Sequence, residues 1–505
     1  MEHPYNIQPI GNLYRKNKRG KVSAALPTRR VDLLGVQISK LDDSLLSNNL
    51  FGFFNARDLA KISPVSTFFY VLCHNKEYWK ALVLQKFGGS FTFHKSWKDT
   101  YVNMLNLHTV QDMDMSKEKK KPSFHRPIKV QTVYSDTLFR SHFCTVAPIA
   151  DKWLEVENID RVDGKKLSVE EFQKNYERPR VPVLLTNLVD KWPCYTKWNW
   201  DYMAKMYSED IHAGGYTFRM NDYILYMQES HDEQPLYIFD KKFVEKSQKD
   251  TLHNGIDRDV SFDYSVPEFF RDENDLFSVL GSERRPDYRW LIAGPARSGS
   301  SFHIDPNGTN AWNAVISGRK KWIMFPPHIV PPGVYPSNDG GDVATPVTLL
   351  EWFLNFYDYA RDMGARECIC NSGELIYVPQ GWWHMVLNLE SGIAITQNYV
   401  SQSNLRFCLD FLKNKSHLVS GVVHERRIGL YNEFTAALKK KKKSIWKEFV
   451  DSSNFNTIEK KSKITKCNKL SKILTSESVN TGISSKSKSK TADSAKLSGF
   501  SFNFF

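Results

Sequence analysis

Three residues have the types and the spacing to bind a metal ion. His303 and Asp305 stand two positions apart in a segment that predicts a β-strand, where residues i and i+2 point to the same face. His384 follows an apolar run over 375–378, which predicts a buried strand, and a Pro-Gln-Gly turn over 379–381. Two imidazoles and one carboxylate form the ligand set that holds non-haem Fe(II). The pattern therefore predicts an iron site made by these three side chains.

Two further residues predict a binding pocket for an anion beside this site. Lys320 follows the apolar run 314–316 and a Ser-Gly turn, so its ammonium is expected between apolar strands, where it needs an anionic partner. Thr396 ends a strand predicted over 392–396, and its hydroxyl could share that anion. A metal ion with a buried cation at carboxylate distance suits a five-carbon dicarboxylate as cosubstrate.

These residues belong to a longer pattern that resembles a Jumonji-C domain oxygenase dependent on Fe(II) and 2-oxoglutarate. The resemblance runs from about residue 153 to about residue 404 and is greatest to the bifunctional arginine demethylase and lysyl-hydroxylase group, also called phosphatidylserine-receptor-like. It is carried by five ordered motifs: Ser-Val-Glu-Glu-Phe (168–172), Pro-Leu-Tyr-Ile-Phe-Asp (235–240), Arg-Arg-Pro-Asp-Tyr-Arg-Trp (284–290), His-Ile-Asp-Pro (303–306) and Ile-Ala-Ile-Thr-Gln-Asn (393–398).

The resemblance implies a mainly β catalytic domain with flanking helices, built as a double-stranded β-helix of the jelly-roll, cupin-like type. It implies Fe(II), O2 and 2-oxoglutarate as cosubstrate, with the metal held by His303, Asp305 and His384. Four residues are implied to form the 2-oxoglutarate pocket, the first three at its distal carboxylate: Tyr237, Lys320, Thr396 and Asn313. Every position of the ligand pattern is intact, which favours catalysis.

The implied reaction is hydroxylation of protein lysyl side chains first, and demethylation of N-methyl arginine or lysine next. Histone-like or RNA-associated proteins rich in Lys and Arg are the expected substrates. The alternative from another class is an F-box substrate receptor of a Skp1-cullin ubiquitin ligase that uses its barrel mainly for binding. A third reading, hydroxylation of an RNA base, draws only on the basic tails of the chain.

The F-box alternative rests on residues 39–87, where short amphipathic helices are expected to alternate with tight turns. The order Leu-x-x-x-Leu-Leu, Arg-Asp-Leu, Ser-x-Val-Ser, Trp-Lys resembles an F-box, a three-helix module that docks a Skp1-type adaptor. Asp42 departs from that pattern, since most F-boxes have proline after the first leucine. The competing interpretation is a small helical cap packed on the oxygenase.

The pattern divides the chain into six regions. They are a basic disordered N-terminus (1–38), the F-box-like module (39–87), a connecting region (88–150), the Jumonji-C domain (151–404), C-terminal helices (405–450) and a disordered Lys/Ser-rich tail (451–505). Within the connecting region we expect a surface loop over 116–122 and a strand that ends near Cys144. The C-terminal helices are expected to cover the barrel or to form a homodimer contact.

The formal net charge of +13 is unevenly distributed. Residues 439–505 carry 16 lysines against five acids, and residues 1–40 carry eight Lys and Arg against two acids, so the body between them is slightly acidic. Basic tails favour nuclear import or contact with RNA or DNA, although solvated tails without a partner are equally compatible. We expect no membrane span and no secretory signal. An odd count of seven cysteines suits a reducing compartment, so we expect the nucleus, or the nucleus and cytoplasm.

Overall fold

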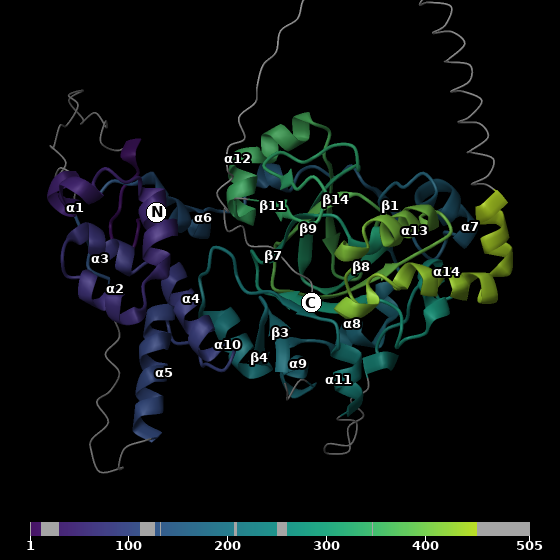
Figure 1. Cartoon of the computed structure of the whole chain (residues 1–505), viewed down its shortest axis with the longest axis horizontal. Helices are drawn as coiled ribbons and strands as arrows, with labels where there is room; N and C mark the ends of the chain where they lie inside the picture. Colours follow the sequence, from purple (N-terminus) through teal and green to yellow (C-terminus); the bar gives the residue numbers. More distant parts are fainter. Residues whose placement is uncertain are drawn as a thin grey trace, which may run out of the picture.

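The described parts of the computed structural model are residues 2–11, 30–111, 127–131, 133–206, 210–249, 260–345 and 347–451. Figure 1 shows a group of N-terminal helices on one side of a β-rich body, with the C-terminal helices α13 and α14 at the opposite end. None of the described helices combines the length and the apolar character that crossing a membrane requires.

Two sheets form the body. In the described residues the larger sheet has nine strands, in the spatial order β1 (Asp160–Asp163), β2 (Val183–Thr186), β13 (Leu375–Val378), β8 (Asn310–Ser317), β15 (Gly392–Tyr399), β6 (Arg289–Gly294), β5 (Ile238–Asp240), β3 (Asp210–Ala213) and β4 (Tyr216–Arg219). The described smaller sheet has the order β12 (Arg366–Asn371), β9 (Arg319–Phe325), β14 (Trp383–Asn388) and β7 (Gly299–His303). A separate described pair joins β10 (Tyr335–Pro336) to β11 (Val343–Ala344).

Apolar side chains from both sheets meet in one core layer. Val315 and Ile376 of the larger sheet share a cluster with Trp322 and Met324 of the smaller sheet. Their strands pair antiparallel with their neighbours, and alternate residues along each strand point to opposite faces. The two sheets therefore pack face to face, and the expected jelly-roll domain with flanking helices is confirmed.

Helix α12 (Leu349–Asp362) covers the outer face of the smaller sheet. Ile323 and Phe325, which alternate with the inward Trp322 and Met324 on β9, pack in one cluster with the buried side of this helix. Both faces of the smaller sheet are thus covered, which explains why its central strands are buried at almost every position.

Six helices precede the barrel in the described residues: α1 (Arg30–Ile38), α2 (Ala56–Ile62), α3 (Thr67–Cys73), α4 (Lys76–Phe87), α5 (Trp97–Gln111) and α6 (Asp136–Val146). The expected helical character of residues 39–87 is confirmed, and Asn55 caps α2 by accepting hydrogen bonds from two backbone amides. These helices do not form a separate core, because Phe93 and Trp97 pack directly on Tyr226, which lies between β4 and β5 in the chain.

Two expectations for the N-terminal part are wrong. Residues 2–11 and 30–38 are not disordered: Ile7 is 1% exposed within the main core, and residues 30–38 form α1. The strand expected to end near Cys144 is α6 instead, where Ser135 accepts a hydrogen bond from the amide of Leu138 as the helix cap. In both places tertiary packing determined the local structure, and tertiary packing cannot be read from local composition.

The other helices flank the sheets. They are α7 (Val169–Phe172), α8 (Pro193–Lys197), α9 (Trp200–Met206), α10 (Met220–Glu229), α11 (Phe243–Lys249), α13 (Leu405–Asn414) and α14 (Leu430–Lys441). The apolar face of α13 packs in one cluster with α14. Its residues follow helical spacing: Leu405, Cys408, Leu409 and Leu412. This face is therefore buried within the chain, and a homodimer contact stays a prediction.

Candidate active site

The structure brings the three predicted metal ligands together. His303 ends β7, and His384 lies directly opposite it on β14 as its cross-strand partner. The centroids of the two rings are 4.1 Å apart. Asp305 lies just beyond the end of β7, and its carboxylate completes a group whose ligand atoms lie within 4.8 Å of one another.

Backbone carbonyls orient both imidazoles. Nδ1 of His303 lies 2.8 Å from the carbonyl oxygen of Ser301, and Nδ1 of His384 lies 3.1 Å from that of Trp382. Each Nδ1–H therefore donates to a carbonyl, which leaves the lone pair on Nε2 available to a metal ion. The local chain fixes the tautomer that metal binding needs.

Burial sets the protonation of the group. It lowers the pKa of His384 to about 4. Burial, and to a smaller extent repulsion from His384, also lowers the pKa of His303 to about 4. The negative charge of Asp305 opposes this shift. Burial raises the pKa of Asp305, although His303 and a hydrogen bond from Asn398 oppose the rise. Both imidazoles are neutral at neutral pH, as metal ligands must be.

Lys320 is a buried cation with neutral partners. Lys320 lies on β9 and is 2% exposed. Its Nζ donates to the hydroxyl of Tyr237 at 2.7 Å and to Oδ1 of Asn388 at 3.0 Å. Among the described residues, no carboxylate forms an ion pair with it. A buried ammonium between a phenol and an amide is suited to receive an anion from outside the chain.

Asn313 and Thr396 form a second pair on the opposite sheet, as cross-strand partners on β8 and β15. Oδ1 of Asn313 is buried and has no hydrogen-bond partner among the described residues. The Thr396 hydroxyl donates to the carbonyl of Trp312 at 2.9 Å, so it must turn before it can donate to an anion. The predicted pocket residues thus form two pairs: Lys320 and Tyr237 are hydrogen-bonded, and Asn313 and Thr396 face each other across β8 and β15.

Comparison with known proteins identifies the family of this chain. A family model described as a cupin-like domain matches residues 169–404. "Arginine-specific demethylase JMJ22" of Arabidopsis thaliana is 43% identical over 439 residues, which are 86% of this chain and 80% of that protein. "Bifunctional arginine demethylase and lysyl-hydroxylase psr-1" of Caenorhabditis briggsae is 37% identical over 57% of this chain and 70% of its own length. The chain belongs to the Jumonji-C family of cupin-like oxygenases.

A more distant match names the cofactors of the family directly. "2-oxoglutarate and iron-dependent oxygenase JMJD4" of Danio rerio is 31% identical over 32% of this chain and 38% of its own length. As a Jumonji-C oxygenase, the protein is an enzyme that uses Fe(II), 2-oxoglutarate and O2. The His-Asp-His donor set fits Fe(II), and the buried cation at Lys320 with the orphaned oxygen of Asn313 fits a polar, anionic cosubstrate.

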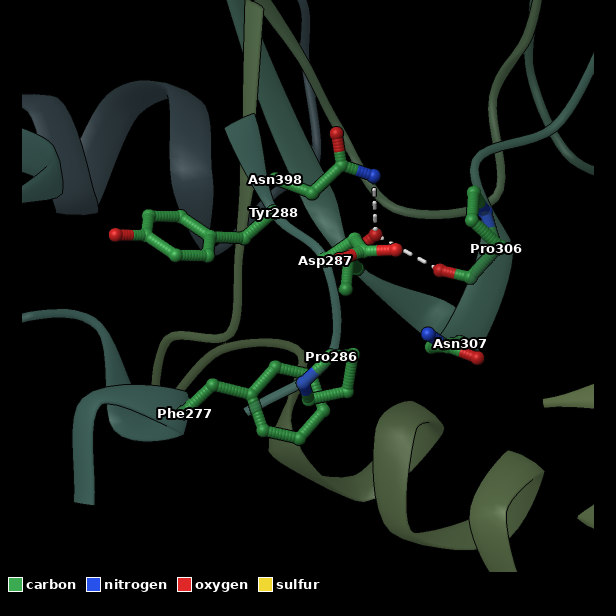
Figure 2. Close-up of a pocket in the computed structure, with 8 residues that line it drawn as sticks. Phe277, Pro286, Asp287, Tyr288, Pro306, Asn307 and Asn398 are labelled. Atoms are coloured by element: carbon green, nitrogen blue, oxygen red, sulfur yellow. Dashed lines mark hydrogen bonds between the residues drawn. The ribbon is translucent and has the colours of Figure 1, made fainter. Parts of the chain in front are cut away.

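The turn that carries Asp305 in this Jumonji-C domain is held from several sides. Asn398 donates to the Thr309 hydroxyl at 2.9 Å, and this hydroxyl in turn donates to the carbonyl of Pro306 at 2.8 Å. Asn404 donates to the carbonyl of Gly308 at 2.8 Å. The small cavity in Figure 2 lies beside this turn, and its described lining includes Asp287 and Tyr288 but none of the three candidate ligands.

Sequence reasoning missed Asn388 as a partner of Lys320. It lies opposite Lys320 on β14, and its amide nitrogen donates to the Ser298 hydroxyl at 2.8 Å. An asparagine shortly before the Glu-Ser-Gly stretch over 390–392 is typical of a hairpin turn, so the sequence offered no separate signal. Only the register of β14 against β9 identifies this residue.

Proposed function

We propose that this oxygenase hydroxylates or demethylates side chains of Arg and Lys in protein substrates, with Fe(II) held by His303, Asp305 and His384. Lys320 and Tyr237 would bind the distal carboxylate of 2-oxoglutarate. One observation supports this proposal most strongly. The described chain has a His-Asp-His group with two neutral imidazoles, together with a buried lysine that lacks a carboxylate partner.

The names of the relatives guide the choice of substrate. One relative, whose match covers 86% of this chain, is named an arginine-specific demethylase, and a second is named both arginine demethylase and lysyl-hydroxylase. N-methyl arginine in a protein is therefore the first substrate to test, and an unmodified lysyl side chain is the second. N-methyl lysine is the third.

The residues of this chain have distinct tasks in the proposed reaction. Iron, 2-oxoglutarate and O2 together supply the oxidation, in which 2-oxoglutarate becomes succinate and carbon dioxide and one oxygen atom enters the substrate. The carbonyls of Ser301 and Trp382 hold both imidazoles in one tautomer. Lys320 neutralises the distal carboxylate. Trp322, stacked at 5.9 Å from the ring of His384, helps to exclude water.

Peptide turnover tests the proposal. The purified protein is incubated with Fe(II), 2-oxoglutarate and peptides that contain methylated arginine, methylated lysine or free lysine, and succinate and peptide mass are both measured. Demethylation removes one methylene from the peptide mass, and hydroxylation adds one oxygen atom. Asp305→Ala serves as the inactive control. A wild-type protein that binds 2-oxoglutarate and alters none of these peptides would overturn the substrate assignment.

The F-box-like region supports a second proposed function, adaptor binding. Leu45, Phe53 and Val65 are large apolar side chains of this region that are 47%, 84% and 66% exposed and so are accessible to a partner. We propose that this surface docks a Skp1-type adaptor, alongside catalysis. A Phe53→Asp, Val65→Asp double variant should lose binding to the purified adaptor and keep succinate release. Leu107→Asp, at an exposed residue of α5, is the matched control.

Nuclear location, chromatin substrates and contacts of the basic tails with nucleic acid stay predictions. Residues 452–505, which carry most of the C-terminal lysines, lie outside the described residues.

A further inference from the structure

The segment that leads into Tyr237 is held in place by the N-terminal helices. Residues 231–236 connect α10 to β5 without helix or strand. From α4, Lys76 donates to the carbonyl of His231 at 3.0 Å and Lys80 donates to that of Gln234 at 3.0 Å. A segment without a backbone ladder depends on such contacts for its conformation.

Asp232 is the centre of these contacts. Its carboxylate accepts from Nζ of Lys80 at 2.9 Å, from the indole N–H of Trp97 at 2.8 Å and from the hydroxyl of Tyr226 at 2.8 Å. The side chains of Asp232 and Lys80 are 2% and 13% exposed. Burial opposes ionisation, but the charge of Lys80 still lowers the pKa of Asp232, so the pair is ionised at neutral pH. Helices α4, α5 and α10 thus converge on one carboxylate.

The same network fixes the residue before Tyr237. The hydroxyl of Tyr226 accepts from the amide of Leu236 at 2.9 Å, and the hydroxyl of Tyr223 donates to the Leu236 carbonyl at 2.8 Å. On the other side the ring of Tyr237 lies against Gly294, where an added Cβ would come within 2.7 Å of Cδ2 of the ring. The direction of the Tyr237 hydroxyl is therefore set by its neighbours on both sides.

A second connection reaches Lys320 from α6. The guanidinium of Arg297 donates to the carbonyls of Cys144 and Ala147 at the end of α6. The amide of Arg297 donates to the carbonyl of Asn388 at 2.7 Å, and Asn388 accepts from Lys320. The N-terminal region therefore supports both neighbours of the Lys320 ammonium, Tyr237 and Asn388.

We propose that the N-terminal helices are a structural part of the 2-oxoglutarate site, with Lys80 and Asp232 as positioning residues for Tyr237. This inference rests on the proposed role of Tyr237 and Lys320 at the distal carboxylate. The Lys80–Asp232 ion pair should change the affinity for 2-oxoglutarate and leave the affinity for the metal unchanged. The reason is that the contacts that orient His303 and His384 come from β7 and from the residues that precede β14. Outer contacts that orient a binding group commonly change affinity by tenfold or more.

Two variants and a matched control test the proposal. Lys80→Met removes the charge and keeps the length of the side chain, and Trp97→Phe removes one hydrogen bond to Asp232 while keeping an aromatic ring. Lys197→Met is the control, because Lys197 pairs with Asp263 at 2.8 Å, which also accepts from an indole, that of Trp198. Among the described residues, the side-chain hydrogen-bond and ion-pair partners of Lys197 and Asp263 do not include the pocket residues.

Calorimetry measures binding of Mn(II), and then of 2-oxoglutarate, to each full-length protein. We expect Lys80→Met to raise the Kd for 2-oxoglutarate roughly tenfold and leave Mn(II) binding unchanged. The KM for 2-oxoglutarate should rise with little change in kcat. Without any ligand, hydrogen exchange at the Leu236 amide should be faster than in the control. Lys197→Met should show none of these changes.

A double variant separates positioning from general stability. In the Tyr237→Phe background, Lys80→Met should not weaken 2-oxoglutarate binding further, because the hydroxyl that it positions is gone. An unchanged Kd in Lys80→Met, or an equal additional loss in the double variant, would overturn the inference. If Lys80→Met does not fold, an unchanged Kd in Trp97→Phe overturns it. Wild-type protein that binds no 2-oxoglutarate would refute the proposed function and this inference with it.

Discussion

Lys320 and Asn388 face each other across the β9–β14 pair, and the ammonium of Lys320 donates to the side-chain oxygen of Asn388 at 3.0 Å. The neighbouring Lys321 points to the other face of the same strand and pairs with Glu367 at 2.8 Å, with both side chains almost fully buried. Two consecutive lysines are thus buried in different ways. One has an internal carboxylate, and the other has only neutral partners among the described residues.

The first prediction concerns the charge of Lys320. Lys320→Met should weaken 2-oxoglutarate binding by about a hundredfold or more, because the distal carboxylate would lose its charged partner. The free protein should not lose thermal stability, since a buried charge without an opposite charge is removed. Calorimetry and thermal unfolding check both parts. The control is Arg319→Met, which breaks only an exposed ion pair with Glu390 and should change neither quantity much.

The second prediction concerns Asn388. Asn388→Asp places a carboxylate beside Lys320, so the chain itself would supply the anion that the cosubstrate otherwise provides. The Kd for 2-oxoglutarate should rise, and the thermal stability of the free protein should be kept or raised. Asn388→Ala separates the effect of the charge from the loss of the amide. Equal affinities in the Asp and Ala variants would contradict competition by the new carboxylate.

The third prediction concerns Asp305. Asp305→Ala should abolish Mn(II) binding and succinate release and leave the fold intact, because two imidazoles remain without the charged ligand. Electron paramagnetic resonance of added Mn(II) and circular dichroism measure these results. Asp287→Ala, in the cavity beside the same turn, is the control and should retain the metal. Wild-type metal affinity in Asp305→Ala would disprove the ligand assignment.

The fourth prediction concerns acid stability of the metal-free protein. His384 has a pKa of about 4 in the folded chain and an ordinary value of 6.5, so the unfolded chain binds more protons between these values. The free energy of unfolding should therefore fall as the pH is lowered from 6.5 towards 4, by about 3 kcal/mol for one histidine with this shift. His303 acts in the same direction, and the raised pKa of Asp305 partly offsets the loss.

Denaturation of metal-free protein across this pH range checks the prediction. His384→Gln should show a shallower loss of stability than the wild type, because one of the two buried imidazoles is absent. His417→Gln, at an exposed histidine outside the site, is the matched control. Identical profiles for His384→Gln and the wild type would show that this imidazole does not titrate as expected.

Local sequence patterns were sufficient to predict the strands that carry the site. The His-x-Asp motif, the apolar run before His384 and the ordered motifs over 168–398 lie in short stretches, and the jelly-roll body that they indicated is confirmed. The i, i+2 argument was incomplete, because β7 ends at His303 and a turn carries Asp305. The three ligand atoms still lie close enough to hold a metal ion, since the turn keeps the carboxylate of Asp305 beside the imidazole of His303.

The sequence by itself determined the residue types of the site, the alternation that buries Lys320 and Lys321 on opposite faces, and the family pattern. Only the tertiary structure decided which lysine has a carboxylate, that Asn388 lies beside the other, and that Asp232 joins the N-terminal helices to Tyr237. Lys320 and Asn388 are 68 positions apart, and Trp97 and Asp232 are 135 apart. Contacts at such separations depend on strand register and on packing between distant helices, which no local stretch of sequence contains.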